Sequence, residues 1–235
     1  MPEIWPRPDI FILAITNLPL AFDLSPSMRQ TAINSQEKAL IVVNAVILAG
    51  GRASRMGGQD KGLVRFNGQS MVAHTLGRIR PQVDSLVINA NRNLDAYQAL
   101  GYDVIPDENQ EFMGPLAGIL SALNHLNDSI LLVVPCDCPW LPLDLVSRMQ
   151  ACMGDSQTDI VVASDGEQEQ PVVLLLKANL AQSIQDYLDA GERKLGAWYR
   201  NQHFSVCAFT DNPDAFMNIN THEQIAQLST RSHLS

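Results

Sequence analysis

The sequence changes character at residues 46–62, which read VILAGGRASRMGGQDKG. An apolar run that starts at Ile41 ends at the pair Gly50 and Gly51, and a Gly-Gly-x-x-Lys-Gly segment follows it. Such a run predicts a buried strand, and the glycines after it allow the backbone to approach an anion closely. We therefore expect a strand that leads directly into a phosphate-binding loop.

The loop after this strand is basic, although the chain as a whole has a formal net charge of -9. Positions 52–65 contain one acidic residue, Asp60, and four basic residues, Arg52, Arg55, Lys61 and Arg65. Arginine and lysine side chains neutralise phosphate, so a phosphorylated ligand explains this local reversal better than a solvated basic turn. The segment has neither the Gly-Lys-[Ser/Thr] end of a P-loop nor the G-x-G-x-x-G fingerprint of a dinucleotide site.

Composition places the chain among ordinary globular proteins. It has 235 residues, of which 46% are hydrophobic and 17% are charged, and this suits one sizeable α/β domain. The isoelectric point near 4.9 argues against a nucleic-acid partner, because phosphate backbones are normally met by a basic face. The four cysteines show no C-x-x-C spacing, so we expect neither a zinc site nor a disulfide framework, and we expect a cytoplasmic location.

Residues 1–40 differ in kind from the rest of the chain. Four prolines occur up to Pro19, around a short apolar run at 10–20. That run is too short to span a membrane, and it lacks the basic flank and the small-residue cleavage site of a signal peptide. We expect a poorly ordered N-terminal extension at 1–40, with Met28 as an alternative start, and a single folded domain at 41–235.

Strands and helices alternate along that domain. The predicted strands are 41–49, 86–88, 102–105, 130–134, 160–163, 172–176, 204–209 and 216–220. The predicted helices are 70–80, 94–100, 114–123, 142–153, 180–188, 194–199 and one capped by Thr221 with Glu223 behind it. This order predicts a single three-layer α/β/α domain with a mostly parallel, Rossmann-like sheet.

In such sheets, ligands bind beyond the carboxyl ends of the strands. The residues that follow the predicted strands are Gly50, Gly51, Asn89, Asn91, Asp107 and Asp137. Asp137 is the most informative, because it follows a fully apolar strand and lies between prolines, and a buried carboxylate needs a cation or hydrogen bonds. Mg²⁺ shared with substrate phosphates is the partner we expect, and the alternative is an aspartate that caps the helix after Pro142.

The other candidates also have simpler interpretations. Asp107 could bind the ligand or only form a turn after a proline. Asn89 and Asn91 are two residues apart at a strand end, so they point the same way; they suit a base or ribose edge, or they cap the next turn. Lys61 and Arg55 could neutralise charge on a transferred phosphoryl group, or they could face solvent.

Two more features accompany these candidates. The helix predicted at 114–123 has a glycine-rich start that includes Gly118, so a ligand could approach its backbone closely. Cys136 and Cys138 flank Asp137 with a one-residue spacing that fits no redox motif. Small buried apolar residues are the better interpretation of these cysteines.

Several motifs occur in a fixed order and together resemble a known family. Leu48-Ala49-Gly50-Gly51, then Arg55-Met56-Gly57 and Lys61, is similar to the signature loop of the nucleotidyltransferase superfamily, which includes sugar-phosphate pyrophosphorylases. Within it, the sequence resembles the molybdenum cofactor guanylyltransferases. The closer resemblance rests on MGGQDKGL at 56–63, NANR at 89–92, GPLAG at 114–118, PCDCP at 135–139, AGER at 190–193 and NINT at 218–221.

The resemblance implies an enzyme that joins GMP from GTP to the terminal phosphate of molybdopterin and releases pyrophosphate, by Mg²⁺-assisted in-line attack on the α-phosphate. It assigns catalysis to Lys61, Arg55 and Asp137, with Asp137 as the Mg²⁺ ligand. The implied nucleotide site comprises Leu48, Ala49, Gly50, Gly51, Lys61, Asn89, Asp107, Gly118 and Asp137, in which the first three hold the guanine. Asn218 and Asn220 would lie on the pterin side.

Partners and rival functions also follow from the resemblance. It implies GTP and the molybdopterin cofactor as substrates, transient contacts with molybdenum insertion proteins and apo-molybdoenzymes, no nucleic acid, no membrane, and a monomer. The nearest rival is a cytidylyltransferase that acts on the same or another phosphorylated acceptor. The family pairs Leu-Ala-Gly-Gly with guanine and Leu-Ala-Ala-Gly with cytosine, so Gly50 favours GTP. A non-catalytic nucleotide sensor is a rival of another class. Gln170 departs from the family pattern, which has a basic or histidine residue before the proline.

Overall fold

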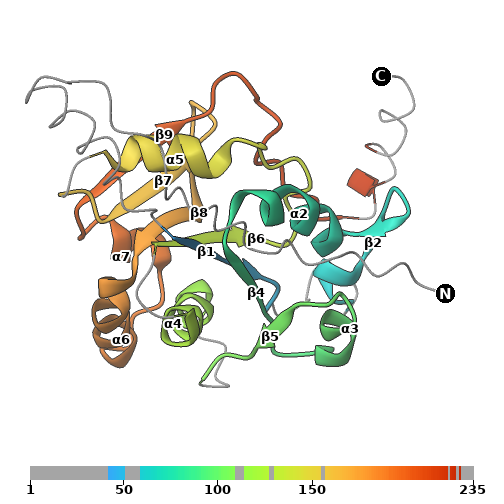
Figure 1. Ribbon diagram of the computed structural model, residues 1–235, viewed down its shortest axis with the longest axis horizontal. Helices are drawn as coiled ribbons and strands as arrows, with labels where there is room; N and C mark the ends of the chain where they lie inside the picture. Colours follow the sequence, from blue (N-terminus) through green and yellow to red (C-terminus); the bar gives the residue numbers. More distant parts are fainter. Residues whose placement is uncertain are drawn as a thin grey trace, which may run out of the picture. The chain divides into compact units, whose positions relative to one another are not determined.

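A seven-stranded sheet forms the centre of the part of the chain that the structure describes. The computed structural model describes residues 42–50, 59–108, 114–126, 130–154, 157–221, 223–225 and 228. It orders the strands β5-β4-β1-β6-β8-β7-β9 (Figure 1). Their bounds are β1 (Val43–Leu48), β4 (Ser85–Asn89), β5 (Asp103–Ile105), β6 (Ile130–Pro135), β7 (Ile160–Ser164), β8 (Glu169–Lys177) and β9 (Phe204–Ala208).

Strand directions agree with the predicted mostly parallel sheet. β1 pairs in parallel with β4 and β6, β4 pairs in parallel with β5, and β7 pairs in parallel with β9. β8 runs antiparallel to both of its neighbours, β6 and β7. The short connection at 165–168 between β7 and β8 accounts for this, because a few residues can join only antiparallel neighbours.

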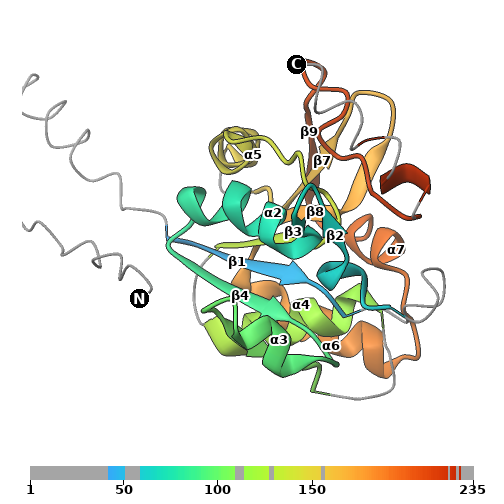
Figure 2. The same cartoon turned by 90° about the vertical axis from the view of Figure 1, so that its right-hand side faces the viewer.

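Helices cover both faces of the sheet (Figures 1 and 2). Residues of α2 (Met71–Ile79), α3 (Leu94–Gln98) and α5 (Leu145–Met153) pack in one core cluster, with Ala45 and Ile47 of β1. Residues of α4 (Pro115–Leu126), α6 (Ala181–Asp189) and α7 (Leu195–Tyr199) pack in the other, with Val46 of β1. Alternate side chains of one strand thus enter opposite cores, and the three-layer prediction is confirmed.

A small hairpin precedes α2 and is absent from the predicted elements. It consists of β2 (Arg65–Phe66) and β3 (Gln69–Ser70), joined by Asn67 and Gly68. Both joining residues have positive φ, 46° and 84°, as the two-residue hairpin turn requires. The Asn-Gly pair is a strong hairpin signal, but strands of two residues are too short to show an alternating pattern.

The segment at 216–220 differs from the prediction, because it forms no strand. Its backbone lies against the loop after β6, where the Ile219 N–H donates to the Asp137 carbonyl at 3.2 Å. Thr221 caps the following turn as predicted, since its Oγ1 accepts from the Gln224 N–H at 3.2 Å. Gln224, rather than Glu223, completes the capping box, with Oε1 accepting from the Thr221 N–H at 3.2 Å and also from the Asn220 N–H at 2.6 Å.

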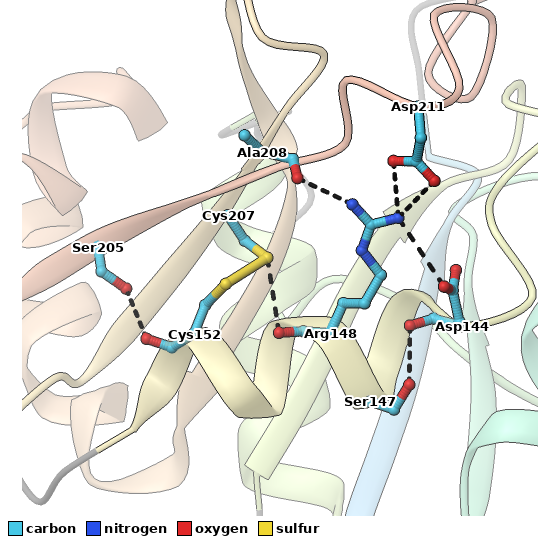
Figure 3. Close-up of a disulfide and its surroundings, with 8 residues drawn as sticks. All are labelled: Asp144, Ser147, Arg148, Cys152, Ser205, Cys207, Ala208 and Asp211. Atoms are coloured by element: carbon cyan, nitrogen blue, oxygen red, sulfur yellow. Dashed lines mark hydrogen bonds and ion pairs between the residues drawn. A yellow bond between two sulfur atoms is a disulfide. The ribbon is translucent and has the colours of Figure 1, made fainter.

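The cysteine prediction is wrong in one respect, because Cys152 and Cys207 form a disulfide (Figure 3). Their Cα atoms are 5.8 Å apart, within the usual range for such a bond. Cys152 lies on α5 and Cys207 on β9, so the fold brings them together across 55 residues. Arg148 of α5 joins the same two segments, donating to the Ala208 carbonyl at 2.9 Å and to the Asp211 carboxylate.

Some predictions fall on residues that the structure does not describe. The extension at 1–40 and its boundary with the domain stay predictions for this reason, and so do the roles of Gly51 and Arg55. Within the described ranges, no helix is both long enough and apolar enough to cross a membrane.

Candidate active site

Four neighbouring strands end level with one another. Leu48 of β1 is in register with Asn89 of β4 and with Pro135 of β6, and Asn89 is in register with Ile105 of β5. In each segment, the residue two positions after the strand end is polar or glycine: Asp107 after β5, Asn91 after β4, Gly50 after β1 and Asp137 after β6. The sheet edge therefore brings together predicted site residues that are far apart in the sequence.

Asp107 is a buried carboxylate held by two asparagines. Asn89 Nδ2 donates to its Oδ1 at 2.9 Å, and Asn91 Nδ2 donates to its Oδ2 at 2.7 Å. The Asn91 side chain also accepts from the Asp107 N–H, at 2.8 Å. Both asparagines thus point the same way, as their spacing predicts, and Asp107 does more than form a turn.

The Asn89 amide has a fixed orientation. Its Nδ2 donates to the Ile105 carbonyl at 3.2 Å as well as to Asp107, so its Oδ1 faces the other way, toward two glycines. A Cβ added at Gly118 would lie 2.3 Å from this oxygen, and one added at Gly50 would lie 3.4 Å from it. Glycine at these two positions therefore lets the backbone of α4 and of the loop after β1 lie close to this acceptor oxygen, where a Cβ would crowd it.

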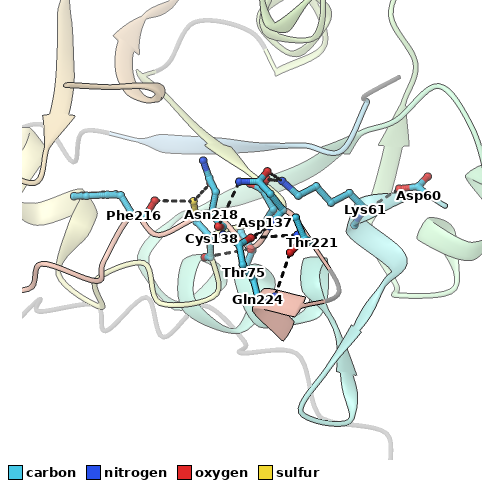
Figure 4. Close-up of polar contacts among 11 residues, drawn as sticks. Asp60, Lys61, Thr75, Asp137, Cys138, Phe216, Asn218, Thr221 and Gln224 are labelled. Carbon is cyan, nitrogen blue, oxygen red and sulfur yellow. Dashed lines mark hydrogen bonds and ion pairs between the residues drawn. The ribbon is translucent and has the colours of Figure 1, made fainter. Parts of the chain in front are cut away.

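Lys61 connects the basic loop to the end of β6 (Figure 4). Its Nζ pairs with Asp137 Oδ2 and donates to Asn220 Oδ1 at 2.5 Å. The lysine is carried by the short 3-10 turn η1 (Lys61–Leu63), and Asp137 belongs to the loop between β6 and α5. α5 begins at Leu145 with Asp144 at its N-cap position, so the alternative that Asp137 caps this helix is wrong.

The second carboxylate oxygen of Asp137 has no partner among the residues that the structure describes. Oδ1 is buried and makes no hydrogen bond within the described part of the chain. A buried anionic oxygen is costly to leave unpaired, and Mg²⁺ prefers such oxygens. No three His, Cys, Asp or Glu side chains of the described residues are grouped so that they could hold a metal ion. Asp137 therefore fits Mg²⁺ only if ligand phosphates and water supply the other oxygens.

The two cysteines beside Asp137 remain thiols. Burial raises the pKa of both Cys136 and Cys138 well above the ordinary value, and the neighbouring Asp137 charge raises it further. Cys138 Sγ donates to Asn218 Oδ1 at 2.8 Å. Protonated, buried thiols make poor nucleophiles, which agrees with their interpretation as small buried residues.

The residues that support Lys61 had no clear signal in the sequence. Asp60 caps η1, and Tyr97 of α3 donates to it. Burial, above all, raises the pKa of Tyr97 far above its ordinary value, so its hydroxyl stays protonated and can donate. Asp60 was visible as the acidic residue before Lys61, but Tyr97 occupies an apolar position of a short helix, and no pattern links the two.

Comparisons with known proteins give the family. The family model of the MobA-like NTP transferase domain matches residues 45–206. The chain belongs to this family. It is 56% identical over 189 residues to a molybdenum cofactor guanylyltransferase from Shewanella frigidimarina, a match that covers 80% of this chain and 96% of the relative. A protein of the same name from Shewanella sp. strain MR-4 is 52% identical over 193 residues, which cover 82% of this chain and 98% of the relative.

A solved structure agrees on the fold of this MobA-like chain. Molybdopterin-guanine dinucleotide biosynthesis protein A from Archaeoglobus fulgidus matches with a TM-score of 0.68 at 18% identity, covering 82% of this chain and 100% of that one. The family model and the relatives show that the chain is a nucleotidyltransferase of the MobA type, and the family predicted from the ordered motifs is confirmed. The roles assigned to single residues by resemblance stay predictions.

Proposed function

We propose that this MobA-like enzyme transfers GMP from GTP to the terminal phosphate of molybdopterin, forming the guanine dinucleotide and pyrophosphate. The observation that carries the proposal is the pairing of Lys61 with a buried carboxylate, Asp137, on the same sheet edge as Asn89 and Asp107. Within the described part of the chain, one oxygen of this carboxylate has no hydrogen-bond partner. The names of relatives at 52% and 56% identity supply the choice of substrates.

The transfer needs positioning and charge more than covalent help from the protein. An oxygen of the acceptor phosphate forms a bond to the α-phosphorus of GTP. The bond from that phosphorus to the oxygen bridging to the β-phosphate breaks, and pyrophosphate leaves with the electron pair. Bound at Asp137 Oδ1, Mg²⁺ would neutralise phosphate charge. Lys61 places its ammonium group beside the same carboxylate, where it would neutralise the charge that develops on a leaving pyrophosphate.

The base contacts depend on the space beside Asn89 and Asn91. A Cβ at position 50 would lie 3.1 Å from Asn91 Nδ2 and 3.4 Å from Asn89 Oδ1. Glycine at this position avoids that tight contact and keeps the backbone after β1 close to both asparagine side chains, and the choice of guanine rests on the names of the relatives. The cytidylyltransferase alternative differs from this proposal in the base alone, so nucleotide binding separates the two.

Thermal unfolding with each of the four nucleoside triphosphates and Mg²⁺ tests the proposal. Only a ligand that binds the folded state stabilises it, and at a concentration of about 100 times Kd the gain is about 2.7 kcal/mol. We expect GTP to raise Tm by about 5–10 °C, and we expect CTP, ATP and UTP to leave it nearly unchanged. Pyrophosphate release should then require GTP and molybdopterin together.

Two lysine variants make this experiment specific. Lys61→Ala should remove most of the GTP-dependent rise in Tm. Lys177→Ala should retain it, because Lys177 pairs with Asp159 outside the site and has a similar side-chain exposure, 28% against 26% for Lys61. A rise in Tm with CTP and none with GTP would show that the protein is a cytidylyltransferase and would contradict the guanylyltransferase proposal. If GTP raised the Tm of Lys61→Ala as much as that of the wild type, Lys61 would not be a phosphate-binding residue.

A further inference from the structure

Asp60, the residue before Lys61, accepts three hydrogen bonds through its carboxylate. Asp60 Oδ1 accepts from the Tyr97 hydroxyl at 2.5 Å and from the Gly62 N–H at 3.2 Å, and Oδ2 accepts from Asn93 Nδ2 at 3.0 Å. Tyr97 lies on α3 and Asn93 directly precedes that helix. These bonds therefore attach the turn that carries Lys61 to the segment that follows β4.

The contact between the turn and α3 leaves little freedom. Tyr97 has an exposed fraction of 0%. A Cβ added at Gly62 would lie only 2.4 Å from the Tyr97 hydroxyl oxygen, so the glycine lets the turn approach the phenol closely. Asn93 holds a left-handed backbone conformation, with φ 52°, and in that conformation its amide reaches the second carboxylate oxygen. Donors on two sides fix the Asp60 side chain, and Asp60 in turn fixes the N–H of Gly62.

We propose that Asp60 and Tyr97 are positioning residues for Lys61, which hold its turn so that Nζ lies beside Asp137 and meets the triphosphate. The inference rests on the proposed function. A lysine side chain is a flexible four-carbon stem, so its ammonium group is well placed only if the backbone below it is fixed. Tyr97 acts through Asp60 and the turn, and it takes no part in the chemistry.

Two tyrosine variants test the proposal against a general loss of stability. Tyr97→Phe removes one hydroxyl that donates to a carboxylate. Tyr199→Phe is the matched control, because Tyr199 also has an exposed fraction of 0% and donates to a carboxylate, Glu169 Oε2, at 2.7 Å. We expect Tyr97→Phe to weaken binding of the Mg²⁺-nucleotide complex by about tenfold and to lower kcat by a similar factor. Tyr199→Phe should change each by less than about twofold.

A double-mutant cycle then separates positioning from direct contact. Nucleotide affinity is measured by titration calorimetry without the acceptor, in the wild-type and Lys61→Ala backgrounds. If Tyr97 acts through Lys61, Tyr97→Phe should have no further effect when Lys61 is alanine. An equal loss of affinity in both backgrounds, or equal losses in Tyr97→Phe and Tyr199→Phe, would overturn the proposal.

Hydrogen exchange gives a second measurement that needs no turnover. The Gly62 amide should exchange faster in Tyr97→Phe than in the wild type or in Tyr199→Phe, and an unchanged rate would contradict the proposal. The cycle uses whichever nucleotide the wild-type protein binds. Binding of CTP in place of GTP would therefore end the guanylyltransferase proposal and leave the test of Tyr97 intact, whereas a wild-type protein that binds no nucleotide would overturn both.

Discussion

Asp137→Asn should lower the rate of nucleotidyl transfer by about 10³-fold, which corresponds to about 4 kcal/mol of transition-state stabilisation. The substitution keeps the shape of the side chain and removes its charge. It removes the negative charge that pairs with Lys61, and it leaves one neutral amide oxygen in place of two carboxylate oxygens, of which Oδ1 is buried and has no hydrogen-bond partner among the described residues. If this oxygen holds Mg²⁺, the variant should also lose the additional rise in Tm that Mg²⁺ gives in the presence of GTP.

Asp159→Asn is the matched control for this variant. Asp159 also pairs with a lysine, Lys177, at 3.0 Å, and its side chain is 22% exposed against 12% for Asp137. Partly exposed ion pairs contribute little, so Asp159→Asn should stay within about 1 kcal/mol of the wild-type free energy of unfolding. Of the two variants, only Asp159→Asn should release pyrophosphate at the wild-type rate. Full release by Asp137→Asn would mean that the metal role has to be abandoned.

The sheet edge could be predicted because it depends on local patterns. An apolar run such as 130–134 indicates a central strand, and the polar residue that follows it, Asp137, must then lie at the carboxyl end. Parallel strands end at the same edge, so Asp107 and Asp137 could be expected there without any knowledge of side-chain contacts. The antiparallel direction of β8 was the main exception, since periodicity carries no information on strand direction.

Contacts between distant side chains could not be predicted in the same way. Lys61 and Asn220 are 159 residues apart, and Cys152 and Cys207 are 55 apart; neither pair has a spacing that indicates contact. Their meeting depends on how loops and helices pack after the sheet has formed. Asn220 could be predicted as a site residue only through the family resemblance. The structure shows that its Oδ1 accepts a hydrogen bond from Lys61 Nζ.

Gly118→Ala should have the second large effect, because it adds a methyl group where three atoms already lie. The new Cβ would be 2.3 Å from Asn89 Oδ1, 2.8 Å from Asn89 Cγ and 2.9 Å from Leu48 Cδ2. Asn89 cannot turn aside without losing its bonds to Ile105 and Asp107. We expect a loss of about 1–3 kcal/mol in the free energy of unfolding and about 100-fold weaker GTP binding.

Gly77→Ala provides the control, since Gly77 is an exposed glycine of α2 whose added Cβ would meet nothing within 4 Å. Alanine favours a helix over glycine by about 1 kcal/mol, so this variant should be more stable than the wild type and bind GTP normally. Adding Asn89→Ala to Gly118→Ala separates the two effects of the methyl group. The double variant should regain part of the lost stability, because the clash is relieved, but it should not regain GTP affinity, because the acceptor oxygen is gone. Wild-type affinity in Gly118→Ala, or in the double variant, would show that the orientation of Asn89 does not control nucleotide binding.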